Sequence, residues 1–260
     1  MRAGFGGMRF GGGGFGGRGL GIGGLLVLLV LGYFLTGNPL GLLGGSDEST
    51  LTTQPAGVPA TDEASKFIRQ VLKDTEQTWD QLFASVNRSY EYPTLVLFSD
   101  SVSSACGFTS AAVGPFYCPR DHKVYIDLSF YRDLDRQFGA PGDFAQAYVI
   151  AHEVGHHVQN LFGQLSGSAS NASSVRQELQ ADCLAGVWGH YAAQRDRLDP
   201  GDVEEGLNAA AAIGDDRIQR RTQGQVSPES FTHGSSADRV RAFEQGFDRG
   251  QITACGIGSR

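Results

Sequence analysis

Residues 147–161 read AYVIAHEVGHHVQNL, and this stretch decides how the whole chain is interpreted. It places His152 and His156 four positions apart with Glu153 beside the first, an HExxH pattern. On an α-helix, residues four apart share one face, so both imidazoles can reach a single metal ion while Glu153 lies next to it. We therefore predict a zinc-binding helix over residues 143–162.

A second stretch downstream, RQELQADCLAGVW, supplies the expected third ligand. A catalytic zinc needs three protein ligands and an open fourth position, and Glu178 is the candidate. Asp182, one helical turn later, is expected to hydrogen-bond the far nitrogen of a ligand imidazole. The alternative is that both carboxylates lie on a solvated helix face. The apolar Ala, Leu, Val and Trp residues around them favour the metal site.

These groups predict a mechanism for hydrolysis. Zinc lowers the pKa of bound water, and Glu153 would take its proton as general base. The tetrahedral oxyanion formed during hydrolysis also needs a hydrogen-bond donor. This role is assigned to His233, although a lone loop histidine is often an ordinary surface residue. His157 lies about 100° around the helix from His156 and is assigned to structure. His122 and His190 are assigned to structure as well.

Composition sets the class of protein. The chain has 260 residues, 40% of them hydrophobic and 19% charged, which is ordinary for a folded domain. Its net charge of −7 and pI near 5.3 argue against a nucleic-acid binder, which needs basic patches to neutralise phosphates. We predict no nucleic-acid partner.

The N-terminal region is expected to form three parts before the folded domain at 61–260. Residues 1–19 read as a Gly-rich cytoplasmic tail. Residues 20–43 are apolar and uncharged, long enough for a transmembrane anchor, which needs roughly 20 residues. Residues 44–60 read as a Ser-, Thr- and Pro-containing linker. A cleaved secretory signal is the competing interpretation of the apolar segment.

The charges that flank this apolar segment predict its orientation. Three arginines precede it and two acidic residues follow it: Arg2, Arg9, Arg18, Asp47 and Glu48. By the positive-inside rule the N-terminus stays in the cytoplasm. We therefore expect a single-pass protein of a bacterial cell membrane, with its catalytic domain extracytoplasmic.

That location would let the four cysteines form disulfides. Sequence alone permits three pairings. We favour Cys106 with Cys118, which closes a short Gly- and Pro-containing loop, and Cys183 with Cys255. A free, buried Cys183 is the alternative.

The pattern of apolar residues predicts an α+β fold that is mainly helical with a small β element. The expected helices cover residues 62–86, 143–162, 174–195, 202–221 and 235–249, and the expected strands cover Thr94–Phe98 and Lys123–Leu128.

Several motifs in order resemble one family: CGFTSAAVGPFYCPRDHKVYIDLSF, AHEVGHHVQN, RQELQADCLAGVWGHYA and FTHGSSADRVRAFEQGF. They are similar to the bacterial neutral zinc metallopeptidases that carry one N-terminal membrane helix, and the site plan looks like that of the gluzincins. The resemblance implies a zincin-like domain, metal ligation by His152, His156 and Glu178, a base role for Glu153 and a supporting role for Asp182. A THGSS stretch preceding an arginine is similar to membrane-associated gluzincins and favours His233.

The predicted function is therefore hydrolysis of peptide bonds in a protein or peptide substrate, with one zinc ion per chain. The main alternative is a non-catalytic, zinc-stabilised module that binds envelope proteins. A third is a metal-free interaction domain in which HExxH is accidental. Structural zinc sites usually close all four positions with Cys or His, which favours the enzyme. The affinity order alone does not select zinc among divalent metals.

Overall fold

The computed structural model of the protein describes residues 63–99, 101–110, 114–165 and 170–258. The predicted tail, membrane anchor and linker over residues 1–60 lie outside these residues. Among the helices that the structure describes, none combines the length and apolar character required to cross a bilayer.

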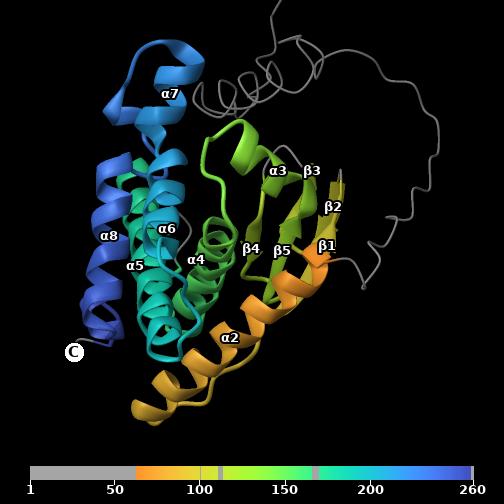
Figure 1. The fold of residues 1–260 in the computed structure, drawn as a ribbon, viewed down its shortest axis with the longest axis vertical. Helices are drawn as coiled ribbons and strands as arrows, with labels where there is room; N and C mark the ends of the chain where they lie inside the picture. The colour runs from red at the N-terminus through yellow and green to blue at the C-terminus, as the bar shows by residue number, and fades with distance from the viewer. Residues whose placement is uncertain (1–62, 100, 111–113, 166–169, 259–260) are drawn as a thin grey trace, which may run out of the picture. The chain divides into compact units, whose positions relative to one another are not determined.

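The described chain begins with a long helix, continues with five short strands and ends with a series of helices. The helices are α2 Glu63–Ser85, α3 Leu128–Arg136, α4 Asp143–Leu161, α5 Asn171–Gln194, α6 Asp202–Ala212, α7 Asp215–Gln223 and α8 Ser236–Arg249, with 3₁₀ turns η2 Pro228–Ser230 and η3 Ile252–Cys255. Figure 1 shows α4, α5, α6 and α8 side by side on one side of the strands, while α2 crosses both groups. The predicted α+β class, mainly helical, is confirmed.

The strands form two small sheets. The first has the order β1-β5-β4, with β1 Thr94–Phe98 parallel to β5 Lys123–Asp127 and β4 Phe116–Cys118 antiparallel to β5. The second is a hairpin of β2 Ser101–Ser104 and β3 Gly107–Ser110. Both predicted strands are present. Strand β5 ends one residue early because the Asp127 carboxylate accepts from the backbone N–H of Ser129 at 2.9 Å and starts α3.

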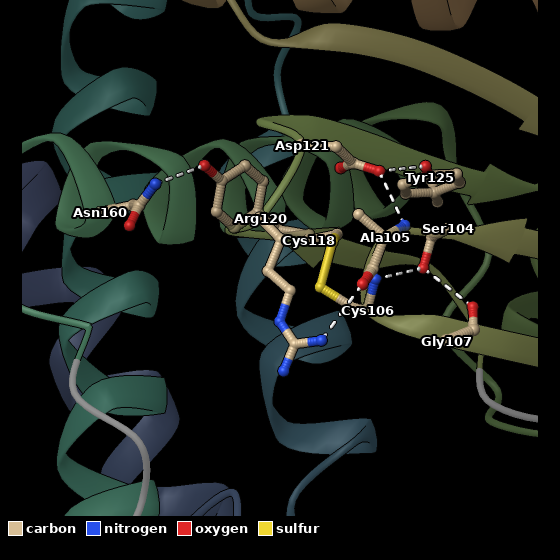
Figure 2. The surroundings of a disulfide bond; sticks show 10 residues. Ser104, Ala105, Cys106, Gly107, Cys118, Arg120, Asp121, Tyr125 and Asn160 are labelled. Atoms are coloured by element: carbon tan, nitrogen blue, oxygen red, sulfur yellow. Dashed lines mark hydrogen bonds between the residues drawn. A yellow bond between two sulfur atoms is a disulfide. The ribbon is translucent and has the colours of Figure 1, made fainter.

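Both predicted disulfides are present, and the described residues hold no free cysteine. The Cys106–Cys118 bond ties the β2–β3 turn to β4, as Figure 2 shows. Beside it, the Asp121 carboxylate accepts from the backbone N–H of Ala105 at 3.1 Å and from the Tyr125 hydroxyl at 2.8 Å. The alternative of a free Cys183 is wrong, since it pairs with Cys255.

Helices α4 and α5 approach closely at one glycine. A Cβ atom built on Gly155 would lie 2.8 Å from the carbonyl oxygen of Ala181, closer than real Cβ contacts. Around this crossing Val154, Val158 and Leu184 are fully buried. Each such side chain contributes about 1.5–3 kcal/mol by leaving water. Gly155 therefore lets the HExxH helix lie directly against the helix that carries Glu178 and Asp182.

One predicted helix was wrong. The stretch 202–221 is divided into α6 and α7. The break falls at Gly214, where a Cβ would lie 2.4 Å from the backbone nitrogen of Ser236, and Asp215 N–H donates to the carbonyl of Gly234 at 2.9 Å instead of continuing the helix. Contacts with a distant segment thus override a continuous local pattern. Helix α3, the hairpin and β4 were not predicted as separate elements.

Candidate metal centre

Helix α4 carries the HExxH pattern through the interior of the helical layer. Its N-cap residue Gly142 has no side chain to cap it, and the carboxylate of Glu205 on α6 accepts instead from the backbone N–H of Phe144 at 3.3 Å. Most of its residues are buried, and His152 and Glu153 are only 6% and 7% exposed. A helix buried on most of its surface holds its side chains in fixed rotamers, which suits a preorganised site.

The structure brings together the three residues that the sequence selects as ligands. His152, His156 and Glu178, here called the ligand cluster, each offer one ligand atom, and these atoms lie within 4.8 Å of one another. His152 Nε2 lies 3.2 Å from Glu178 Oε2, and His156 Nε2 lies 3.6 Å from Glu178 Oε1. Two imidazole nitrogens and a carboxylate oxygen from two packed helices therefore converge on one point.

The spacing of these atoms fits zinc. Bonds of 2.0–2.2 Å in a tetrahedron place the ligand atoms about 3.4 Å apart. The observed separations of 3.2 and 3.6 Å lie on either side of that value. Three protein ligands of the His, His, Glu type also leave the fourth position open, as in catalytic zinc sites.

The imidazole of His152 is backed by a buried charge network. Its Nδ1 lies 2.8 Å from Asp182 Oδ1. Asp182 also accepts from the Tyr148 hydroxyl and from Arg239, whose Nε and Nη2 each lie 2.9 Å from one carboxylate oxygen. Asp182 and Arg239 are 0% and 2% exposed. The predicted role of Asp182 as partner of a ligand imidazole matches this geometry.

The charges in this network favour the ionised form of Asp182 and the protonated form of His152. Burial alone would raise the pKa of Asp182, but the Arg239 guanidinium and His152 outweigh it and lower the pKa. Burial opposes protonation of His152, yet the Asp182 carboxylate raises the pKa of His152 to about 10. A metal ion at Nε2 competes with a proton for the same lone pair, so metal binding is coupled to proton release.

The imidazole of His156 is backed by neutral groups. Its Nδ1 lies 2.8 Å from Gln159 Oε1. The amide nitrogen of Gln159 donates to the carbonyl oxygen of Gln177 at 2.6 Å and to Gln180 Oε1 at 2.9 Å. Gln159 is fully buried.

Glu153 lies beside the ligand cluster without belonging to it. Burial raises the pKa of its carboxyl group, while the two ligand histidines lower it. On α3, the buried hydroxyl of Tyr131 has no hydrogen-bond partner among the residues that the structure describes. Burial, and then the Glu153 carboxylate, raise the pKa of that hydroxyl. Glu153 is therefore a buried carboxylate with a raised pKa, and so a stronger base than a carboxylate in water.

The other histidines lie in different surroundings. The buried ring of His157 contacts the Tyr117 hydroxyl at 3.0 Å and the Glu91 carbonyl at 2.6 Å, which confirms the structural interpretation. His233 has a half-exposed side chain, and its Nδ1 lies 3.3 Å from Asp215. Within the described residues no hydrogen bond joins His233 to the ligand cluster, so its role as oxyanion donor stays a prediction.

His122 and His190 also make local contacts. His122 pairs with Glu91 at 2.7 Å, and His190 Nδ1 lies 2.7 Å from the carbonyl oxygen of Phe247. Both contacts agree with the structural assignment.

A second group of carboxylates could hold a cation by spacing alone. Asp143, Asp202 and Glu205 place ligand atoms within 4.8 Å of one another. Glu205 already caps α4, and Asp202 accepts from the backbone N–H of Asp199 at 2.8 Å. Two of the three carboxylates therefore already serve as acceptors for backbone N–H groups.

Three contributors to the site were missed from the sequence: Arg239, Gln159 and Tyr131. Arg239 lies within the quoted THGSSADR stretch, so a pattern signal existed for it. Gln159 follows His156 by three positions, the spacing of side chains that meet on a helix. Tyr131 carried no signal, because only the packing of α3 against α4 brings it near Glu153.

Comparison with known proteins agrees with this geometry. A family model described as "Putative neutral zinc metallopeptidase" matches residues 1–257. YpfJ of Escherichia coli K12, an uncharacterised protein, is 49% identical over 241 residues, covering 89% of this chain and 84% of YpfJ. Rv2575 of Mycobacterium tuberculosis H37Rv, also uncharacterised, is 42% identical over 209 residues, covering 74% of this chain and 71% of Rv2575. No solved structure matches the chain.

Proposed function

Since this chain belongs to the neutral zinc metallopeptidase family, we propose that it hydrolyses peptide bonds at one zinc ion held by His152, His156 and Glu178. One observation carries the proposal. The three ligand atoms converge within 4.8 Å, while the buried carboxylate of Glu153, the residue after His152, interacts electrostatically with all three ligands without being one of them. A structural zinc site has no use for a second acidic group left outside the ligand set.

The roles of the chain's own residues follow from their positions. A zinc ion in the cluster would supply Lewis acidity, polarising the scissile carbonyl and making water acidic near neutral pH. Glu153 takes the proton from the attacking water and passes it to the leaving amine. Asp182 and Gln159 hold the two imidazoles so that each Nε2 faces the metal position. His233 is proposed as the donor to the developing oxyanion.

The test is digestion of a mixed peptide library by the purified full-length chain loaded with zinc, read by mass spectrometry. Glu153→Gln should keep about one zinc per chain and lose cleavage by at least about 100-fold, because only the base is removed. Glu244→Gln, an exposed glutamate on α8, is the control and should cleave like the wild type. Silence from a zinc-loaded wild type would favour the non-catalytic, zinc-stabilised binding module instead.

We also propose that residues 20–43 anchor the chain in a bacterial cell membrane with the catalytic domain outside the cytoplasm. The two disulfides support an oxidising compartment, because cytosolic thiols are kept reduced. A membrane-impermeant protease added to intact spheroplasts should degrade the domain. Protection of the domain until the membrane is dissolved would refute this location. The substrate would then be an extracytoplasmic protein or peptide.

A further inference from the structure

The imidazole of His156 is linked by hydrogen bonds to the end of the described chain. Gln159 Oε1 lies 2.8 Å from His156 Nδ1, and the amide nitrogen of Gln159 donates a hydrogen bond to Gln180 Oε1 at 2.9 Å. The amide nitrogen of Gln180 then donates to the carbonyl oxygen of Cys255 at 2.8 Å. We name Gln159 and Gln180 together the glutamine relay.

The direction of every bond in this relay is determined by backbone carbonyls. A carbonyl oxygen can only accept, so Cys255 requires the amide nitrogen of Gln180 to point toward it. Gln180 must then present Oε1 to Gln159. The carbonyl oxygen of Gln177, 2.6 Å from Gln159 Nε2, imposes the same orientation on Gln159. Only one assignment of oxygen and nitrogen satisfies all of these contacts.

This orientation selects the tautomer of His156. Gln159 Oε1 can only accept, so Nδ1 of His156 must carry the hydrogen. The lone pair of the neutral ring then lies on Nε2, the nitrogen 3.6 Å from Glu178 and directed into the ligand cluster. The neutral amide of Gln159 thereby orients the imidazole of His156, as the Asp182 carboxylate orients that of His152.

Cys255, whose carbonyl oxygen accepts from Gln180, is held in a fixed position. Cys255 is joined to Cys183 of α5 by the second disulfide. On either side of it, Ile252 and Ile257 are 4% and 0% exposed and belong to the main hydrophobic core. The carbonyl that orients Gln180 is therefore held by a covalent bond and by packing, over 70 residues away in sequence from the glutamine it orients.

We infer that Gln159 and Gln180 are positioning residues through which the disulfide-anchored C-terminal segment, residues 251–258, sets the zinc affinity of His156. This inference rests on the proposed zinc site. It assigns to the C-terminal segment a part in metal binding, although none of its atoms belongs to the ligand cluster. Loss of the relay frees the imidazole of His156 to rotate or to adopt the other tautomer, which weakens the zinc bond.

The test measures zinc dissociation constants of the full-length protein by competition with a chromophoric chelator. Gln159→Leu removes the acceptor of His156 and should weaken zinc binding by about 10- to 100-fold, as loss of a partner of a ligand imidazole does. Gln180→Leu leaves Gln159 in place but releases its orientation, and should weaken binding by up to about tenfold. Because Gln180 is only half-buried, this second variant disturbs the core less.

Gln245→Leu is the matched control. Gln245 is exposed on α8 and donates to the carbonyl oxygen of Ala254, one residue from Cys255, but it has no part in the relay. Its zinc affinity should equal that of the wild type. Melting of each variant in excess chelator, followed by circular dichroism, verifies that the metal-free domain is folded.

The possible results separate the inference from the function on which it rests. Unchanged zinc affinity in folded Gln159→Leu and Gln180→Leu would overturn the inference while leaving the peptidase proposal intact. An equal loss in all three variants would also overturn it, because general loosening of the C-terminal segment would then be the cause. A wild-type chain that binds no zinc would overturn the proposed function itself, and the relay's role with it.

Discussion

The two imidazoles of the ligand cluster lie one turn apart on α4, but they are held by different chemistry. His152 is backed by the buried ion pair of Asp182 and Arg239, and His156 by the uncharged amides of Gln159 and Gln180. A buried ion pair is costly to break, because the remaining charge has no water to solvate it. A neutral hydrogen bond costs less to lose. The His152 side should therefore dominate stability, while both sides affect zinc affinity.

The largest effect is expected from Arg239→Met. This change leaves the fully buried Asp182 carboxylate without the Arg239 guanidinium, with only His152 and the Tyr148 hydroxyl beside it, and should lower the free energy of unfolding by about 3–5 kcal/mol. Gln159→Leu, on the neutral side, should cost about 1–3 kcal/mol. Urea denaturation in excess chelator measures both without the contribution of a bound metal. Equal losses of stability in Arg239→Met and Gln159→Leu would show that the charged and the neutral partners contribute alike to folding.

Arg241→Met is the control for the charged side. Arg241 lies two residues further along α8 and pairs with Asp238, but its side chain is 65% exposed. A solvent-exposed pair contributes at most about 1 kcal/mol. A loss as large as that of Arg239→Met would mean that any arginine on α8 is equally important.

The ease of prediction also differs between the two sides. His152, Glu153 and His156 lie within five consecutive positions, so helical periodicity is enough to group them. Glu178 and Asp182 follow the same rule on the next helix. Arg239 lies 57 residues from Asp182, and only the packing of α8 on α5 brings them together. The Gln180 contact with Cys255, 75 residues away, is equally nonlocal.

The same distinction explains which parts of the fold were predicted. Helices α2, α4, α5 and α8 have continuous apolar faces, and their predicted bounds agree with the structure to within a few residues. The break at Gly214 depends on the backbone of Ser236, which local periodicity does not contain. The β2–β3 hairpin is built largely from serines and carries little apolar signal. Sequence patterns therefore reveal elements that are stabilised locally and miss those that are determined by distant contacts.

A second prediction concerns the helix crossing that both sides share. Gly155→Ala places a methyl group 2.8 Å from the carbonyl oxygen of Ala181, so α4 and α5 must separate. Overpacking of this kind costs about 1–3 kcal/mol. Zinc affinity should also fall, because the histidines and Glu178 lie on different helices. Thermal melting and chelator competition measure the two effects.

Gly189→Ala is a suitable comparison for that variant. Its added Cβ meets the edge of the Phe247 ring at 3.1 Å, a side chain that can shift, rather than a backbone atom. We expect a smaller loss of stability and unchanged zinc affinity. Identical behaviour of the two glycine variants would argue against a special role for the α4–α5 crossing.

A third, smaller effect is expected from Tyr148→Phe. The Tyr148 hydroxyl donates to Asp182 and accepts from Arg239 Nη2 at 3.2 Å, so its removal should cost about 0.5–1.5 kcal/mol. Tyr90→Phe is the control, because the Tyr90 hydroxyl is also buried but has no hydrogen-bond partner in the described part of the chain. Removing it should be neutral or slightly stabilising. If both variants lose the same stability, the hydroxyl of Tyr148 is not part of an energetic network.

The smallest effect concerns Asp215, which holds the loop leading to α8 and Arg239. Its carboxylate accepts from the backbone N–H groups of Thr232, His233 and Gly234. Burial would raise the pKa of Asp215, but the His233 side chain and these N–H groups lower it below 3.8. A group with a lowered pKa in the folded state stabilises the protein above its ordinary pKa, and this stability is lost as pH falls through the lowered value.

Asp215→Asn should therefore lower the stability most near neutral pH and flatten the acid limb of the stability curve below about pH 4, where its curve approaches that of the wild type. Urea denaturation from about pH 3 to about pH 7 measures this, with the exposed Asp248→Asn as a control that keeps the wild-type slope. Parallel curves for Asp215→Asn and the wild type would show that the loop is held by its backbone alone. A flattened limb would instead show that the ionised Asp215 carboxylate stabilises the loop that leads to α8, the helix that carries Arg239.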